Sequence, residues 1–285
     1  MKSMIRTEDR AVLRDFARIA EQNDIPYVLV GTGARLLVFD WQYNFRSEHT
    51  TTDWDIGVQI SSWVAFKRLK RALTGGANPT FTEDPVAHRF KHITGVAIDI
   101  IPFGGLERAG GIIVWPQDER QMVVLGFREV QLKAVKIDIG EGVFVPVATP
   151  PGLAILKVFA FHDRHWDDDL RDLFFILDNY ERAGNEERIF NELTDLFLSK
   201  TLEYEFSGAY LLGMDVGRLV NPKILKSLLR IISPLLDPFS PGLAPLIRII
   251  GDERQEENER RRIAKKFEAF EAGVKAIKKI KKDNR

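Results

Sequence analysis

TTDWDIGV, residues 51–58, raises the question of why two aspartates share one strand. The segment otherwise has the character of a β-strand, for which Asp is poorly suited. Successive strand side chains point to opposite faces, so Asp53 and Asp55 share a face while Trp54 and Ile56 point into the presumed core. Two like charges on one face repel each other, so this face needs a compensating partner.

A third aspartate occurs in a similar setting further along the chain. In VAIDIIPF (residues 96–103), Asp99 takes the face opposite to the isoleucines that flank it. If the two strands are neighbours, Asp99 converges with Asp53 and Asp55 on one patch. Converging carboxylates are unfavourable unless a cation neutralises them, and a hard divalent ion prefers carboxylate oxygens, water and substrate phosphates. The three residues therefore predict a site for Mg²⁺ or Mn²⁺; the alternative is that they decorate a solvated face of each strand.

The glycine turn VGTG (residues 30–33) follows the strand-like PYVLV and opens a helix-like segment. Backbone N–H groups of such a turn can hold phosphate oxygens, helped by the helix dipole. No Gly-Lys-Ser/Thr follows, which excludes a Walker A loop, and a dinucleotide fingerprint lacks its third glycine because Leu36 stands there. A calcium loop beginning at Asp53 fits poorly, since its twelfth position is Val64 instead of Glu.

The surrounding segments alternate between helical and strand-like patterns up to a hairpin whose second arm is VAIDIIPF. This order predicts a mixed sheet with helices packed on it, an α/β (α+β) fold. Residues 106–148 contain short β-like runs (GIIVWP, QMVVLGF and VFVPVA), and the pattern is helical from TPPGLAILKVFAF onward. Pro150 and Pro151 punctuate that change, so we expect a sheet domain over residues 1–148 and a helical domain over residues 149–285.

The composition narrows the class of protein. The 285 residues include no cysteine, which excludes a disulfide framework, a thiolate nucleophile and a Cys-ligated zinc site. No segment has the length of a signal-peptide core or a membrane span, so we expect a cytoplasmic protein without a membrane partner. The net charge is zero, but residues 260–285 hold eleven Lys or Arg against three Asp or Glu. This basic tail can contact phosphates, although its helical apolar spacing favours a helix whose charges are merely solvated.

A strand, a glycine turn into a helix, a D-x-D strand and a third Asp on a later strand resemble the nucleotidyltransferase superfamily of the DNA polymerase β type. More narrowly, TDWDIGV, IDIIPFGG and the later LKVFAFHDRHWDDDLRDLFFIL resemble the AbiEii-type nucleotidyltransferases, known as toxins of toxin–antitoxin and phage-defence systems. The resemblance covers residues 20–180. It implies a nucleotidyltransferase domain that moves a nucleoside monophosphate from a nucleoside triphosphate to a hydroxyl acceptor.

Carried over to this chain, the resemblance implies that Asp53 and Asp55 hold the metal ion. Asp99 completes the metal site or deprotonates the attacking hydroxyl. The family usually has two adjacent glycines where this chain has a Gly-Thr pair, and often an Arg where this chain has His49, so that nearby Arg46 is the candidate substitute. The resemblance implies nucleotide contacts in this domain from Gly31, Thr32, Gly33, Arg46 and Thr51.

The helical half contributes further candidates. AILKVFAFHDRHWDDDLRDLFFIL (residues 154–177) places Lys157 and Asp172 along one stripe if it forms one continuous helix. The alternative is two helices with a break near HDRHWDD, the second capped by one of the aspartates that follow Trp166. The resemblance implies that Lys157, with Asp169 or Asp172, belongs to the nucleotide site. The plainer interpretation of Lys157 is an exposed charge on an ordinary helix.

Three hypotheses about function follow. The first is a two-domain, Mg²⁺-dependent nucleotidyltransferase that acts on a hydroxyl of RNA, such as a tRNA end, or of a protein, with an antitoxin as a further partner. The second is a catalytically silent relative that binds a nucleotide or an antitoxin, motivated by the altered turn and by His49. The third is a small-molecule nucleotidyltransferase of the aminoglycoside-modifying kind, against which the basic tail argues mildly.

Overall fold

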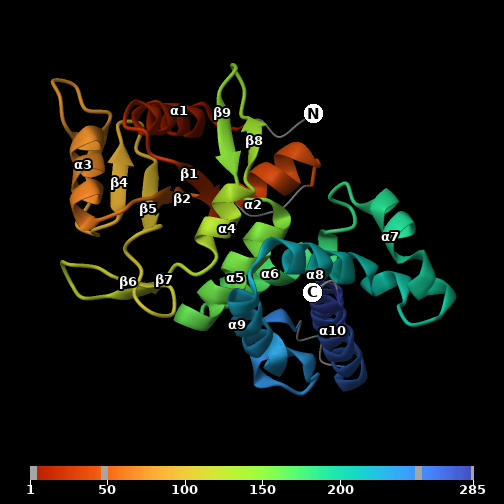
Figure 1. Cartoon of the computed structure of the whole chain (residues 1–285). Helices are drawn as coiled ribbons and strands as arrows, with labels where there is room; N and C mark the ends of the chain where they lie inside the picture. Colours follow the sequence, from red (N-terminus) through yellow and green to blue (C-terminus); the bar gives the residue numbers. More distant parts are fainter. Residues whose placement is uncertain (1–4, 46–50, 248–251, 284–285) are drawn as a thin grey trace. The chain divides into compact units, whose positions relative to one another are not determined.

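The computed structural model describes residues 5–45, 51–247 and 252–283. It divides the chain into two compact units, Met1–Thr149 and Pro150–Arg285. Figure 1 shows that the first unit contains the β-sheet and that the second is helical. The predicted fold class, a mixed-sheet α/β unit followed by a mainly helical one, is confirmed.

The first unit is built on a mixed sheet of seven strands in the order β3-β4-β5-β2-β1-β9-β8. Its central strand β2 is parallel to β5 on one side and antiparallel to β1 on the other. The strands of this sheet are β1 (Tyr27–Val30), β2 (Asp53–Gln59), β3 (Phe81–Glu83), β4 (Arg89–His92), β5 (Ala97–Phe103), β8 (Val135–Asp138) and β9 (Phe144–Val147).

Helices cover the apolar side chains that these strands present. The amphipathic first helix buries Val12, Phe16 and Ile19 along one stripe, and the third begins where the Ser62 hydroxyl accepts a hydrogen bond from the Ala65 N–H. The helices of this unit are α1 (Thr7–Gln22), α2 (Gly31–Arg35), which continues into a π-helical stretch (Leu36–Gln42), α3 (Trp63–Thr74) and α4 (Phe127–Leu132).

The predicted hairpin is present, because β4 pairs antiparallel with β5. In the region that follows, β8 and β9 extend the main sheet, whereas β6 (Ile112–Val114) and β7 (Gln121–Val123) form a separate two-stranded hairpin. Helix α4 was not predicted there. Within the β-like run QMVVLGF the strand ends at Val123, and Gly126, with a left-handed backbone (φ 92°), is the N-cap of this short helix, whose first residue Phe127 is buried.

The second unit consists of helices, and two of the connections between them contain three 3₁₀ turns. Within the described part of the chain, no helix is both long and apolar enough to cross a membrane. The helices are α5 (Pro150–Arg164), α6 (Asp167–Asn179), α7 (Glu186–Leu198), α8 (Ser207–Leu219), α9 (Pro222–Ile232) and α10 (Glu253–Asp283), with the 3₁₀ turns Tyr204–Phe206, Ser233–Leu236 and Pro241–Leu246.

The continuous-helix interpretation of residues 154–177 is wrong, and the two-helix alternative is correct. His165 adopts a left-handed conformation (φ 52°) and Trp166 is extended, so the chain leaves the helical path between α5 and α6. Trp166 occupies the N-cap position without a side-chain cap. Asp167 and Asp168 therefore lie inside the first turn of α6, where negative charge favours the helix N-terminus.

The basic tail forms the amphipathic helix α10, whose apolar side chains Phe267, Phe270 and Val274 are fully buried. α10 packs along α8. Several of its cations are engaged by acidic side chains of the same unit, namely Arg262 with Asp178 and Glu205, Lys265 with Glu203, and Lys266 with Asp178. The described part of the tail is therefore a helix, as its apolar spacing predicted, but several of its charges form ion pairs and are not merely solvated.

Candidate active site

The three aspartates of the sheet unit lie on one face of two neighbouring strands. β2 and β5 run parallel with Asp55 beside Asp99, and Asp53 lies one pleat along on the same face. Trp54 and Ile98 pair on the opposite face, where both are almost fully buried. β2 and β5 are therefore neighbours, which is the condition for Asp53, Asp55 and Asp99 to share one face of the sheet.

Arg89 neutralises two of these carboxylates. Its Nε and Nη2 donate to Asp99 Oδ1 and Oδ2, each at 2.7 Å, and the same Nη2 donates to Asp53 Oδ2 at 2.6 Å. One guanidinium nitrogen is therefore shared by carboxylates from two strands. The hydrogen bonds with Asp99, together with the negative charges of Asp99 and Asp53, raise the pKa of Arg89. Charge-assisted, bidentate pairs of this kind are among the stronger hydrogen bonds in proteins.

The hairpin register delivers Arg89 to this position. β4 runs antiparallel to β5, and Arg89 stands directly opposite Asp99. Opposite charges at facing cross-strand positions attract. The hairpin was predicted, but Arg89 was missed. Arg89 is visible in the sequence as a cation in the first arm of the hairpin, and only the register of the two strands shows that it faces Asp99.

His88 and Arg120 lie at the edge of the same cluster and were also missed. Arg120 Nη2 donates to His88 Nδ1 at 2.8 Å, and His88 Nε2 lies 3.9 Å from Asp99 Oδ2, beyond hydrogen-bonding distance. Burial lowers the pKa of His88, and the positive charges of Arg120 and Arg89 act in the same direction against the attraction of Asp99. His88 is therefore neutral at pH 7, and the bond from Arg120 assigns its proton to Nε2.

The glycine turn packs against the carboxylate of Asp55. Asp55 pairs with Val30 at the end of β1, and Gly31 follows with a left-handed backbone (φ 69°). A Cβ atom at Gly31 would lie 2.0 Å from Asp55 Oδ2, so a residue with a side chain cannot stand here without displacing the carboxylate. Thr32 comes next in α2, whereas Gly33 faces the indole of Trp54 on the core side.

The other nucleotide contacts predicted for this unit are only partly within the described residues. Thr51 lies immediately before β2, and its Oγ1 donates to the Asp53 carbonyl oxygen at 2.6 Å. That bond fixes the start of the strand that carries the aspartates. Arg46 and His49 lie outside the described residues.

The donor set suits a hard divalent cation in kind, because all three side chains are carboxylates and two of them already converge on a positively charged nitrogen. Among the residues that the structure describes, however, no group of three or more His, Asp or Glu side chains is close enough to hold a metal ion. The guanidinium of Arg89 bridges Asp53 and Asp99. A metal ion bound by both carboxylates therefore requires Arg89 to release at least one of them.

In the helical unit, Lys157 is only 7% exposed and its ammonium is held by two carboxylates. Nζ lies 3.0 Å from Asp169 Oδ1 and 2.7 Å from Asp172 Oδ2, and Arg164 binds Asp169 through two further bonds. Burial opposes the charged form of Lys157, but Asp172 and Asp169 outweigh it and raise the pKa of the ammonium. The plainer interpretation of Lys157 as an exposed charge is wrong, because its ammonium lies inside an ion-pair cluster of the unit.

No protein-family model and no curated protein sequence matches the chain. Solved structures similar to it include an antigenic nucleotidyltransferase-like protein from Paracoccidioides brasiliensis, with 14% identity and a TM-score of 0.40 over 70% of this chain and 94% of that one. A second is the antibiotic-resistance factor ANT(2'')-Ia, with 12% identity and a TM-score of 0.33 over 67% of this chain and 96% of that one. A third is the Thermotoga maritima CCA-adding enzyme complexed with tRNA, with 13% identity and a TM-score of 0.24 over 97% of this chain and 84% of that one. At these TM-scores, the geometry of the chain itself must carry the functional inference.

Proposed function

We propose that this chain is a Mg²⁺-dependent nucleotidyltransferase whose catalytic residues are Asp53, Asp55 and Asp99. The observation that carries the proposal is the convergence of Asp53 and Asp99 on one cationic nitrogen, with Asp55 in register beside Asp99. In the reaction, the oxygen of an acceptor hydroxyl forms a bond to the α-phosphorus of a nucleoside triphosphate. The bond from that phosphorus to the bridging oxygen breaks, and pyrophosphate leaves.

The roles proposed for the aspartates are those that the family resemblance implies. Asp53 and Asp55 would hold the metal ion, and Asp99 would complete that site or accept the proton of the attacking hydroxyl. When bound, Mg²⁺ neutralises the triphosphate and stabilises the attacking and leaving oxygens. Arg89 holds Asp53 and Asp99 in position before the ion binds. Gly31 has no side chain between the turn and the Asp55 carboxylate, so a triphosphate bound at the turn would lie beside the proposed metal ligands.

The test is transfer of label from each α-labelled nucleoside triphosphate, with Mg²⁺, to three separate acceptor pools: total RNA, a protein extract and an aminoglycoside. We expect the wild type to label one pool and to release pyrophosphate. Asp53→Asn and Asp99→Asn should each lower the rate by about 100-fold or more, because each removes a charge that the reaction needs. The matched control is Asp24→Asn, an exposed aspartate of the same unit whose left-handed conformation suits asparagine.

Equal labelling by the wild type and Asp53→Asn in every pool would refute the enzyme proposal. The pool that is labelled decides among an RNA, a protein and a small-molecule acceptor. If the aminoglycoside alone accepts label, the small-molecule alternative replaces the macromolecular one.

A second candidate function is a catalytically silent nucleotide-binding protein. The observation that favours it is Arg89, which already neutralises Asp53 and Asp99 without any external cation. Calorimetry separates the two functions. Nucleoside triphosphate binding without turnover and without dependence on Mg²⁺ supports the silent protein, and binding that requires Mg²⁺ supports the enzyme.

The narrower resemblance adds a proposed biological role as the toxin of a toxin–antitoxin or phage-defence pair. Induced expression should then arrest growth for the wild type and the Asp24→Asn control but not for Asp53→Asn. Growth unaffected by the wild type, at equal protein level, would argue against the toxin role while leaving the proposed chemistry to the transfer assay.

A further inference from the structure

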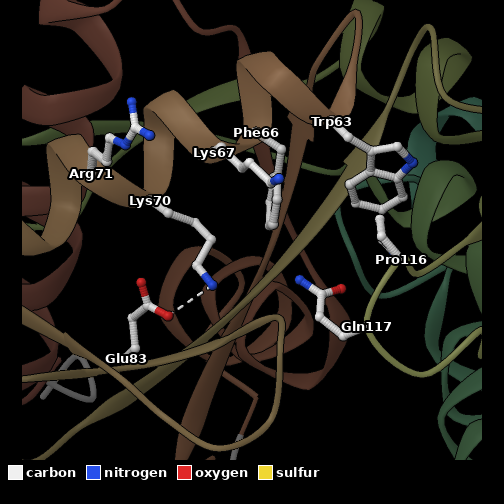
Figure 2. A pocket seen from close by; sticks show the side chains of 8 residues that line it. All are labelled: Trp63, Phe66, Lys67, Lys70, Arg71, Glu83, Pro116 and Gln117. Carbon is white, nitrogen blue, oxygen red and sulfur yellow. Dashed lines mark ion pairs between the residues drawn. The ribbon is translucent and has the colours of Figure 1, made fainter.

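A basic trough lies along helix α3 in the sheet unit, apart from the three aspartates. It encloses a volume of about 220 Å³ between α3, strand β3 and the loop after β6 (Figure 2). Figure 2 shows Lys67 on α3 about one turn before the adjacent Lys70 and Arg71, with the indole of Trp63 at one end. The trough is lined by Trp63, Phe66, Lys67, Lys70, Arg71 and Glu83, together with residues 116–117.

The charge of this trough is strongly positive. The sequence of α3, WVAFKRLKRALT, contains four cations and no acidic residue. Lys70 is paired with Glu83 at 2.8 Å, but in the described part of the chain no carboxylate forms an ion pair with Lys67 or Arg71, both of which are exposed. Uncompensated cations spaced along one helix attract a ligand that carries several phosphates.

One end of the trough is aromatic. The indole of Trp63 is half-buried and held in place by Phe66 and Trp115, with ring centroids 5.7 Å and 5.3 Å away. Because it also lines the trough, it offers a pre-oriented aromatic surface next to the cations. Aromatic side chains beside a cationic groove are the combination that binds single-stranded nucleic acids, since every unpaired base has a face that can stack.

The trough is connected to the aspartates through packed rings. Trp115 contacts Trp63 on one side and His88 on the other, with a centroid distance of 5.5 Å to the imidazole. His88 in turn lies 3.9 Å from Asp99. All of these residues belong to the sheet unit, so two rings, those of Trp115 and His88, link Trp63 of the trough to Asp99.

We propose that this trough binds single-stranded nucleic acid, with backbone phosphates on Lys67, Lys70 and Arg71 and one base stacked against Trp63. Its volume of about 220 Å³ is below that of a pocket that encloses a small ligand, which favours one segment of a longer strand over a free nucleotide. Binding of a single strand to the trough does not depend on the proposed function. Only the further step, that this strand supplies the acceptor hydroxyl, depends on the proposed function.

The experiment measures fluorescence anisotropy of an end-labelled, mixed-sequence RNA of about 12 nucleotides, a length within the range that such surfaces cover. It uses the full chain without nucleoside triphosphate or Mg²⁺. Lys67→Glu/Arg71→Glu should weaken binding at least about tenfold, and the slope of log affinity against log salt should fall in magnitude by about 1.4 for two lost phosphate contacts. Trp63→Ala should weaken binding about fivefold or more, whereas Trp63→Phe retains most of it.

The matched control is Arg128→Glu/Lys133→Glu, which changes the charge of the same unit equally at two exposed positions outside the trough. Equal weakening by the control pair would overturn the proposal, and so would competition by AMP or ATP as effective as that by unlabelled RNA. Lys67→Gln/Arg71→Gln repeats the test without charge reversal, and circular dichroism verifies folding. Because Asp53→Asn should bind this RNA like the wild type, failure of RNA binding and failure of catalysis are observed separately.

Discussion

At the scale of single residues, Arg89 determines the state of the candidate active site. It supplies the positive charge that the sequence analysis assigned to a metal ion. Arg89 and a bound metal ion would compete for Asp53 and Asp99. The two sources of positive charge therefore predict different responses to Mg²⁺.

We predict that Arg89→Gln makes the stability of the protein depend on Mg²⁺. Without Mg²⁺, the free energy of unfolding should fall by about 1–2 kcal/mol, because charge-assisted bonds are lost at a site that is one-third exposed. Excess MgCl₂ should restore more stability to Arg89→Gln than it adds to the wild type, since the ion no longer competes with the guanidinium. Thermal unfolding with and without MgCl₂ measures both effects.

Arg128→Gln, at an exposed position of the same unit, is the control and should respond to MgCl₂ like the wild type. If MgCl₂ stabilised Arg89→Gln and the wild type equally, Arg89 would not occupy the place of the ion.

What the sequence predicted at this scale depended on the range of each interaction. The alternation of β2 and β5 is local, so the shared face of Asp53, Asp55 and Asp99 could be predicted from the segments themselves. The partner Arg89 could not, because it depends on the register of a third strand. The sequence left Lys157 either in the nucleotide site or exposed on an ordinary helix, because it does not show which carboxylates a helix break brings around this residue.

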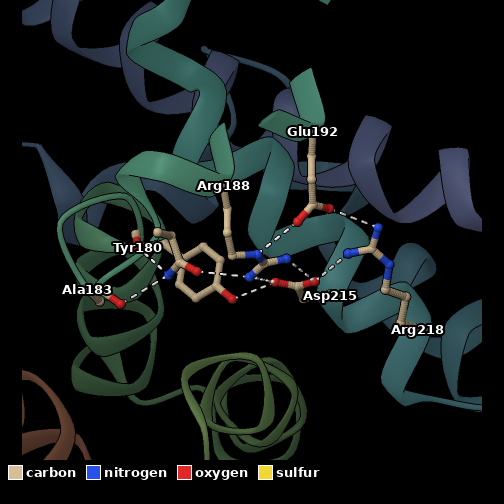
Figure 3. Close-up of polar contacts among 7 residues, drawn as sticks. Tyr180, Ala183, Arg188, Glu192, Asp215 and Arg218 are labelled. Atoms are coloured by element: carbon tan, nitrogen blue, oxygen red, sulfur yellow. Dashed lines mark hydrogen bonds and ion pairs between the residues drawn. The ribbon is translucent and has the colours of Figure 1, made fainter. Parts of the chain in front are cut away.

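At the scale of elements, a polar network joins three helices of the helical unit (Figure 3). Asp215 on α8 accepts bonds from the Tyr180 hydroxyl after α6, from two nitrogens of Arg188 on α7, and from Arg218, at 2.6–3.0 Å. Glu192 accepts from the same two arginines. Burial alone would raise the pKa of Asp215, but the bonds from Arg188, Tyr180 and Arg218 lower it below its usual value.

This lowered pKa predicts how the stability of the helical unit changes with pH. A carboxyl group whose pKa is lower in the folded than in the unfolded chain stabilises the fold above its unfolded value of about 3.9, and that stability is lost as the pH falls through the folded value. At pH 7, Asp215→Asn should lower the free energy of unfolding by about 1–3 kcal/mol. The difference from the wild type should shrink in acid, as urea unfolding at a series of pH values measures.

Asp195→Asn, on the exposed side of α7, is the control and should change little at either pH. A difference between Asp215→Asn and the wild type that stayed constant down to strongly acidic pH would show that the carboxylate charge is not what stabilises the network.

The contact between α8 and α10 gives a second prediction at this scale. A Cβ atom at Gly273 would lie 2.0 Å from the Tyr210 carbonyl oxygen, so the two helix backbones touch at this point. Gly273→Ala should therefore separate the helices and lower the free energy of unfolding by about 1–3 kcal/mol, despite the better helix propensity of alanine. Lys275→Ala, exposed one half-turn away, should cost less than Gly273→Ala in the same denaturant titration; equal costs would contradict the close contact.

Element boundaries were predictable where the local signal was strong. The amphipathic α1 and the hairpin that contains β5 follow from apolar periodicity alone. The region after β5 was harder, since its strands of three or four residues are too short to show a period and α4 begins at a glycine that could equally mark a turn.

At the scale of the whole molecule, the chain divides its charged groups between two units. The sheet unit contains the three aspartates, Arg89 and the basic trough, whereas the helical unit encloses Lys157 within its own ion pairs. The mixed-sheet and helical classes of these units could be predicted from the change of pattern at Pro150 and Pro151. The function assigned to the molecule therefore depends on whether the sheet unit binds a divalent ion at the aspartates.

Electron paramagnetic resonance of Mn²⁺ titrated into the protein, with a non-hydrolysable nucleoside triphosphate present, tests that claim most directly. We predict that the wild type and Asp24→Asn bind Mn²⁺ equally. Asp53→Asn and Asp99→Asn should bind it at least about tenfold more weakly, since each removes one charged ligand. Equal Mn²⁺ affinity in all four proteins would contradict the account, because the carboxylates of β2 and β5 would then not form a metal site.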